Sequence, residues 1–173
     1  KFCRSVVPIP IKISFFDQEG NKIRFNHLNK YRDEHYLILE KREDKFTFPE
    51  INKRLIPSIL RDYSAPVSLK TDLTLSDHIH LLRFDDNLFK KWDICQNLHL
   101  KLIKSKNLEL FSNSIKQIIN NVTIDNSITS LILTPPSYRT FQNNLFNYDP
   151  LDLYDMRNSY LTKFYKNLEV DLY

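Results

Sequence analysis

Alternating apolar and polar positions dominate the beginning of the chain. Residues 9–15 (IPIKISF) place an isoleucine or phenylalanine at every second position, which is the pattern of a half-buried β-strand. The following polar residues include Gly20, which can adopt a positive φ and therefore favours a tight turn. A return strand at 22–25 (KIRF) would complete a hairpin over residues 8–25.

Further short strands are predicted after this hairpin. Residues 35–40 (HYLILE) and 45–51 (KFTFPEI) are rich in β-branched and aromatic side chains, and a charged turn separates them. The segment 55–69 (LIPSILRDYSAPVSL) is apolar again and is expected to be the last strand, with Tyr63 as a plug in the interior. We therefore predict a small β-sandwich over residues 1–72.

The hydrophobic period changes near residue 76. In 85–104 (DDNLFKKWDICQNLHLKLIK), apolar residues recur three or four positions apart, with Asp85 and Asp86 as candidate N-caps and with Phe89 and Trp92 expected in the core. Further helices are predicted at 112–122, 125–133, 138–146 and 149–168, and each of the first two opens on an Asp or Ser that can cap it. Residues 76–173 are therefore expected to form helix pairs in the manner of an α-solenoid.

Composition narrows the range of functions. The formal charge is +4, but acidic and basic residues are interleaved, which is typical of a solvated surface. A basic cluster at 101–106 (KLIKSK) keeps nucleic-acid binding open as a less favoured alternative. Gly20 is the single glycine of the chain, and this excludes glycine-rich phosphate loops and dinucleotide fingerprints.

The cysteines and the ends of the chain suggest its cellular context. Cys3 and Cys95 are too few and too far apart to form a disulfide framework, so we expect a reducing, cytoplasmic environment. No apolar run is long enough to predict a membrane span. The first residues, KFCRSVVPIP, include neither a starting methionine nor a signal peptide, so the chain is expected to be a piece of a longer protein.

A search for catalytic chemistry gives mainly negative results. No histidine is followed by the glutamate of a zinc-binding His-Glu-x-x-His helix, and His78 and His80 would diverge on a helix. Ser64 is not flanked by the glycines of a nucleophile elbow. Asp85, Asp86 and Asp93 can be read as a carboxylate cluster for acid–base work, but helix capping explains the first two more simply. We therefore predict no catalytic residue and no metal ligand within this chain.

Four segments carry a resemblance to a known family. Residues 55–67 (LIPSILRDYSAPV) resemble the strand that ends the β-domain of M1-family zinc aminopeptidases of the aminopeptidase N (alanyl aminopeptidase) type. Residues 6–23, 81–96 and 133–161 resemble, in the same order, an earlier hairpin and helices of the following helical domain. The positions that match the family pattern are Arg61, Asp62, Tyr63, Ser64, Ala65, Pro66, Asn87, Phe89, Trp92, Asp93 and Gln96.

This resemblance implies an α+β multidomain fragment, with a β-sandwich at 1–72 and the start of a helical superhelix at 76–173. The parent enzyme would remove N-terminal amino acids from peptides with a zinc-bound water, and its zinc site would lie outside this chain. The chain would then be a non-catalytic structural portion whose partner is the catalytic domain, and Arg61 and Asp62 would anchor a domain boundary. A free-standing protein-interaction module on the same scaffold is the main alternative.

Overall fold

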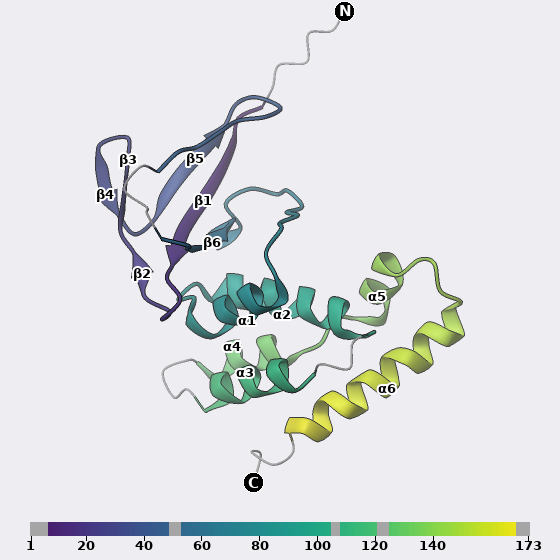
Figure 1. Ribbon diagram of the computed structural model, residues 1–173. Helices are drawn as coiled ribbons and strands as arrows, with labels where there is room; N and C mark the ends of the chain where they lie inside the picture. Colours follow the sequence, from purple (N-terminus) through teal and green to yellow (C-terminus); the bar gives the residue numbers. More distant parts are fainter. Residues whose placement is uncertain (1–6, 49–52, 105–107, 121–124, 169–173) are drawn as a thin grey trace, which may run out of the picture. The chain divides into compact units, whose positions relative to one another are not determined.

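A computed structural model describes residues 7–48, 53–104, 108–120 and 125–168 of the chain. It divides into two compact units, residues 1–90 and 91–173, and each is described by itself below. The described part of the first unit holds all the strands and one complete helix, and the second unit is helical (Figure 1).

The first unit is built on strand β1 (Ile9–Phe16), which pairs antiparallel with three others (Figure 1). These are β2 (Lys22–Ile23), β5 (His35–Leu39) and β6 (Ile56–Ile59). The β1–β2 hairpin confirms the predicted turn, in which Gly20 has a φ of +91°. A second, two-stranded ribbon consists of β3 (Phe25–His27) and β4 (Lys30–Arg32).

The core of the sheet lies under the apolar face of β1. Ile13, Phe25 and Leu37 are buried together, and the rings of Phe46 and Phe48 pack against them. The predicted strand at 45–51 is wrong for its described part, because residues 45–48 are irregular, while 49–51 lie outside the described residues. These residues contribute apolar side chains to the core without pairing along a sheet edge, and the proline that follows Phe48 restricts its backbone.

The predicted last strand is shorter than expected. β6 ends at Ile59, and a 3-10 turn, η1 (Arg61–Tyr63), follows it. Tyr63 is 57% exposed, so it does not plug the interior as predicted, whereas Ala65 is buried. Helix α1 (Leu75–Phe84) begins after a capping box formed by the side chains of Thr74 and Asp77, and it contacts β6.

Helix α2 (Leu88–Leu102) begins in the first unit and continues into the second. Its first turn is capped by Asn87, whose Oδ1 accepts a hydrogen bond from the Lys90 N–H at 2.9 Å. The prediction that Asp85 and Asp86 cap this helix is therefore wrong, and these carboxylates turn instead toward the sheet. Trp92 is 37% exposed, so the prediction that it lies in the core is also wrong.

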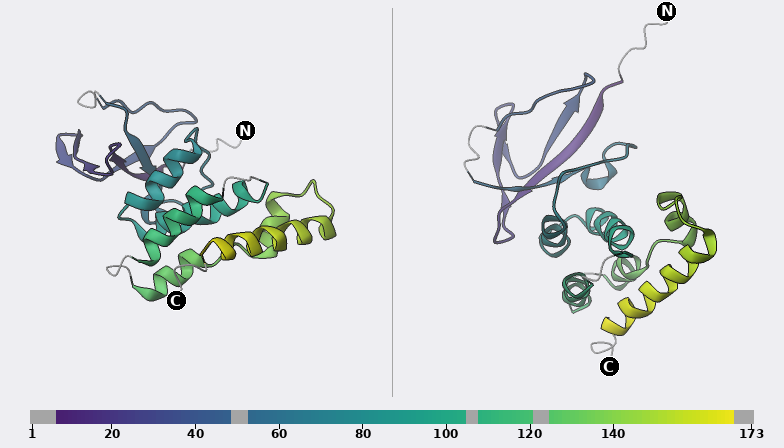
Figure 2. Two further views of the ribbon diagram at one scale, coloured as in Figure 1. Left: turned by 60° about the horizontal axis from the view of Figure 1, so that its bottom comes forward. Right: turned by 45° about the vertical axis from the view of Figure 1, so that its right-hand side comes forward.

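In the described part of the second unit there are four further helices, and α6 runs beside α5 and α3 (Figure 2). Their bounds are α3 (Glu109–Ile119), α4 (Asn126–Leu133), α5 (Tyr138–Asn144) and α6 (Pro150–Leu168). Asp125 and Ser137 cap α4 and α5 as N-cap residues. Helix α3 differs from the prediction, because Leu108 precedes it and no side chain caps it.

Over the described ranges, none of the helices combines the length and the apolar character that crossing a membrane requires.

Candidate functional site: a buried arginine among carboxylates

The segment that carries the family motif has an unusual backbone. Leu60, Asp62 and Tyr63 all have φ values between 52° and 58°, in the left-handed region that side chains with a Cβ normally avoid. Left-handed residues cost free energy, so neighbouring contacts must hold the chain in this shape. The turn directs Arg61 inward and leaves Asp62 and Tyr63 exposed.

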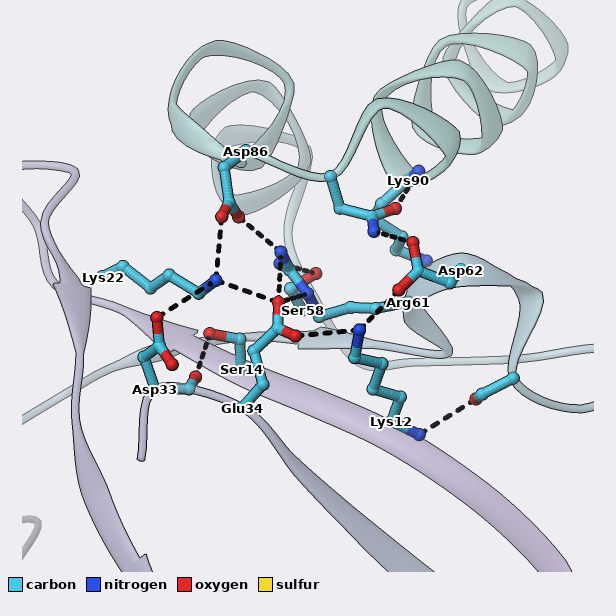
Figure 3. A network of polar contacts seen from close by, with 12 residues as sticks. Lys12, Ser14, Lys22, Asp33, Glu34, Ser58, Arg61, Asp62, Asp86 and Lys90 are labelled. Carbon is cyan, nitrogen blue, oxygen red and sulfur yellow. Dashed lines mark hydrogen bonds and ion pairs between the residues drawn. The ribbon is translucent and has the colours of Figure 1, made fainter. Parts of the chain in front are cut away.

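Arg61 lies at the centre of a polar network in the first unit (Figure 3). Its side chain is 1% exposed, and Nη1 lies 2.6 Å from Oδ1 of Asp85, which is fully buried. Nε donates to Glu34 Oε1 at 3.0 Å, Nη1 also donates to Ser58 Oγ at 3.2 Å, and Nη2 contacts both Glu34 and Asp86. Four of these contacts are hydrogen bonds and the fifth, between Nη2 and Glu34 Oε1, is an ion-pair contact, so each of the three guanidinium nitrogens donates to an acceptor.

Two lysines of the sheet complete the network (Figure 3). Lys12 Nζ lies 2.8 Å from Glu34 Oε2 and also contacts Asp62. Lys22 Nζ lies 2.9 Å from Glu34 Oε1 and 2.8 Å from Asp86 Oδ2. The network therefore joins β1, β2, the residues before β5, the turn after β6 and the α1–α2 connection.

The electrostatics differ between the inner and outer carboxylates. Burial raises the pKa of Asp85 above its usual range, although Arg61 and Ser58 oppose this effect. Burial acts in the same direction on Asp86, but hydrogen bonds from Lys22 and Arg61 outweigh it and hold the pKa of Asp86 at about 2. A hydrogen bond from Lys12 lowers the pKa of Asp62 below its usual range.

Asp62 and Asn87 link the outer edge of the network to the start of α2. The Asn87 side-chain amide donates to Asp62, and the Asn87 N–H donates to Asp85 Oδ1 at 2.8 Å. The Ser64 hydroxyl accepts a hydrogen bond from the Lys12 N–H at 2.9 Å, which fixes the turn against β1. The structure thus brings together Arg61, Asp62, Ser64 and Asn87 of the sequence motif.

The other motif residues do not belong to this network. The ring of Phe89 packs 5.5 Å from that of Tyr63, and Pro66 is exposed. Trp92, Asp93 and Gln96 lie in the second unit, where the Gln96 side chain donates to the Thr134 carbonyl at 2.8 Å.

Sequence reasoning misses most of the network around Arg61. Glu34, Lys12, Lys22 and Ser58 were not singled out, and Asp85 was interpreted as a cap. One signal was present: Lys12 and Ser14 occupy the polar positions of β1 that alternate with its apolar ones, and Ser14 is fully buried. A buried polar residue opposite the apolar face indicates a second, polar contact surface of the sheet.

The second unit has a buried polar group of a different kind. His99 of α2 is fully buried, and its Nδ1 lies 2.8 Å from the Tyr160 hydroxyl. The rings of Phe111 and Phe164 pack against it at 5.0 and 4.9 Å. Burial, together with the positive charge of Arg157, lowers the pKa of His99 to about 4, so this imidazole is neutral at pH 7.

Neither cluster has the chemistry of a metal centre. Within the ranges that the structure describes, no group of three or more His, Cys, Asp or Glu side chains could hold a metal ion. The carboxylates of the network face lysine and arginine nitrogens, and His78 makes its ring contact with the Thr74 carbonyl at 2.8 Å. The described residues therefore do not fit a zinc ion, and the arrangement is suited to holding elements together.

Comparison with known protein families shows which family the chain belongs to. Residues 3–72 match a family described as "Domain of unknown function (DUF3458) Ig-like fold". Residues 75–173 match a family described as "Domain of unknown function (DUF3458_C) ARM repeats". The chain belongs to the DUF3458_C family. The predicted fold class, an α+β fragment with a small β-sandwich followed by a solenoid-like helical domain, is confirmed by the Ig-like fold and the ARM repeats of these families.

Curated relatives and solved structures of the DUF3458_C chain carry aminopeptidase names. Aminopeptidase N of Haemophilus influenzae is 29% identical over 154 residues, and aminopeptidase N of Escherichia coli is 25% identical over 162 residues. These matches cover 82% and 87% of this chain but only 18% of each relative. The crystal structure of Legionella pneumophila aminopeptidase A in complex with aspartic acid matches 96% of this chain and 19% of its own, with a TM-score of 0.81 and 26% identity.

These findings confirm the resemblance to the M1 aminopeptidases that four sequence segments indicated. The DUF3458_C chain aligns with a segment of these aminopeptidases and spans about 18% of the length of the curated relatives it matches.

Proposed function

We propose that this chain is a non-catalytic structural portion of a zinc-dependent aminopeptidase that removes N-terminal amino acids from peptides. The observation that carries the proposal is the burial of Arg61, the most buried charged residue of the family motif, with every guanidinium nitrogen donating to an acceptor of this chain. A buried guanidinium group whose three nitrogens all donate to neighbouring acceptors is suited to a structural role rather than to binding a substrate. Its contacts instead hold the sheet against the α1–α2 connection.

The remaining roles follow from this assignment. The zinc ion, its ligands and the general base would belong to a catalytic domain outside these 173 residues, and that domain would be the partner of this chain. Residues 1–72 and 76–173 would be the two domains of the segment, in a cytoplasmic enzyme that acts on peptide substrates. The sheet domain would support the catalytic domain, and the helical domain would begin the wall that restricts the active-site chamber to peptides.

A substitution in the complete enzyme tests this division of roles. Arg61→Met should lower the temperature of thermal inactivation, whereas kcat and the zinc content of the folded enzyme at low temperature should stay within about twofold of the wild type. Arg54→Met is the matched control, because Arg54 makes an ion pair with Asp77 but its side chain is 66% exposed. A loss of kcat of about a hundredfold with zinc and stability retained would contradict the proposal.

The isolated chain provides a second test. The purified 173-residue polypeptide should not hydrolyse an aminoacyl anilide. Turnover of that substrate by the isolated chain, abolished by a chelator, would show that the catalytic group lies within it.

A further inference from the structure

A cavity of about 430 Å³ lies beside β6 in the first unit. One wall is β6 with the residues that precede it, and the other is the segment 69–73, which leads to α1. The volume falls within the range of ligand-binding clefts. Neither the polar network around Arg61 nor the proposed function uses this cavity.

The register of the sheet shows which edge of β6 is paired. The Lys12 N–H points toward the β6 side of β1, because it donates to Ser64 Oγ. The Asp17 N–H points toward the other side, because it donates to the Asn21 carbonyl in the β1–β2 turn. Main-chain groups alternate along a strand, so Ser14 and Phe16 point toward β6 like Lys12. Ser58 and Ile56 lie opposite Ser14 and Phe16 on β6. They therefore form the main-chain hydrogen bonds between β6 and β1.

Pro57 and Ile59 consequently direct their main-chain groups away from β1. A proline at position 57 agrees with this register, because a residue without an N–H cannot form a reciprocal pair. No described residue forms a hydrogen bond with the Ile59 N–H, the Ile59 carbonyl or the Pro57 carbonyl. Both residues also line the cavity. An edge with free donors and acceptors is a template on which another extended segment can add.

The side chains of the cavity suggest what kind of segment would fit. Ile56, Leu69 and Leu73 supply apolar surface. Among the charged lining residues, Arg54 is paired with Asp77, whereas Lys70 and Asp72 form no ion pair with a described residue. Lys70 and Asp72, a cation and an anion that no described residue neutralises, complement a strand that carries charges of both signs between apolar residues.

We propose that this cleft, between the outer edge of β6 and the segment 69–73, binds an extended peptide segment by strand addition. Ile59 and Pro57 would supply the main-chain hydrogen bonds. Lys70 and Asp72 would select a segment in which acidic and basic side chains alternate with apolar ones.

A blocked, fluorescein-labelled peptide, acetyl-Val-Glu-Val-Lys-Val-amide, tests the proposal in the intact protein that contains this chain. Fluorescence anisotropy should show saturable binding. N-methylation of alternate peptide amides should weaken the affinity about tenfold, because it removes main-chain hydrogen bonds. Hydrogen exchange of the Ile59 amide should be fast in the free protein and slow about tenfold at saturating peptide.

Two variants of the segment after Pro66 form a matched pair. Leu69 and Val67 are 39% and 38% exposed, but only Leu69 lines the cleft. Leu69→Glu should weaken binding about tenfold, and Val67→Glu should leave it within about twofold. The proposal is overturned if the peptide does not bind, if N-methylation or Leu69→Glu has no effect, or if the Ile59 amide is already protected in the free protein.

Discussion

The two units each bury a basic side chain, and they accommodate it in opposite ways. Arg61 in the first unit is 1% exposed and surrounded by carboxylates. His99 in the second unit is fully buried among aromatic rings, with the Tyr160 hydroxyl as its polar partner. The first unit keeps Arg61 charged and supplies counter-ions, whereas the second unit keeps His99 neutral.

This difference follows from the chemistry of the two side chains. A guanidinium group cannot lose its proton in a protein, so its burial requires acceptors and negative charge. An imidazole becomes neutral at a small cost when burial lowers its pKa, and it then needs few polar partners. The first unit should therefore be sensitive to the loss of a partner, whereas the second should be sensitive to pH.

The largest effect is expected from Arg61→Met. This change removes the cation but leaves Asp85 buried without its counter-ion, which costs about 3–5 kcal/mol of unfolding free energy. Urea denaturation followed by far-UV circular dichroism measures the loss. The matched change Arg54→Met removes one exposed ion pair and should cost about 1 kcal/mol or less.

A double variant distinguishes loss of the charge pair from loss of packing. Arg61→Met combined with Asp85→Leu removes both inner charges and should recover part of the lost free energy. A cost for Arg61→Met no larger than that of Arg54→Met would mean that the network does not stabilise the first unit.

The next effect concerns pH and the second unit. Because the folded state holds the pKa of His99 at about 4, below the ordinary value of 6.5, the unfolded chain binds the proton more readily. The contribution of neutral His99 to the free energy of unfolding is therefore fully present above about pH 6.5, and it is lost as the pH is lowered toward 4. The gap between the two pKa values corresponds to about 3 kcal/mol.

Trp92 is the single tryptophan and lies in the second unit, so its fluorescence during urea denaturation at each pH reports on this loss. His99→Gln retains a side chain that can hydrogen-bond to Tyr160 but does not titrate, and it should flatten the profile between pH 6.5 and 4. His80→Gln, which leaves His99 in place, should not. An unchanged slope in His99→Gln would assign the pH dependence to another group.

A smaller effect is expected at the β1–β2 turn. Gly20 has a left-handed φ of +91°, and a Cβ at this position would overlap the ring of Phe84 on α1. Gly20→Ala should cost about 2 kcal/mol, from backbone strain and from displacement of the ring. Combining it with Phe84→Ala separates the two causes, because only the steric part should disappear. Equal costs in both backgrounds would mean that the ring moves away freely.

Much of the fold was predictable because local patterns agree with the tertiary structure. The period-two pattern of β1, the turn at Gly20 and the helical spacing of α2 and α6 each reflect one buried face. The predicted strand at 45–48 fails because Phe46 and Phe48 are buried by side-chain packing alone. Strand propensity does not distinguish that case from true pairing.

The network around Arg61 was predictable only in part. Family resemblance singled out Arg61, Asp62 and Asn87, but the side chains that neutralise Arg61 come from distant positions such as Glu34 and Asp85. Paired aspartates before a helix have the sequence pattern of a cap, and only the tertiary fold shows that they face a buried arginine. The left-handed residues of the motif are Leu60, Asp62 and Tyr63. None of them is a glycine or an asparagine, so the sequence does not indicate this backbone conformation.

The smallest effect separates the exposed from the buried part of the network. Lys12 contacts Glu34 and Asp62, and these carboxylates remain 27% and 54% exposed, so water can replace the lysine. Lys12→Met should therefore cost about 1 kcal/mol or less of unfolding free energy.

Salt distinguishes the two parts of the network. In about 0.5 M salt, screening acts over a few ångströms, so the cost of Lys12→Met should decrease. The cost of Arg61→Met should persist, because its inner ion pair is shielded from dissolved ions. Parallel urea titrations at low and high salt measure both differences. If the two costs decrease together, Arg61 and Lys12 experience the same solvent-screened environment, and the distinction between an inner and an outer part of the network is wrong.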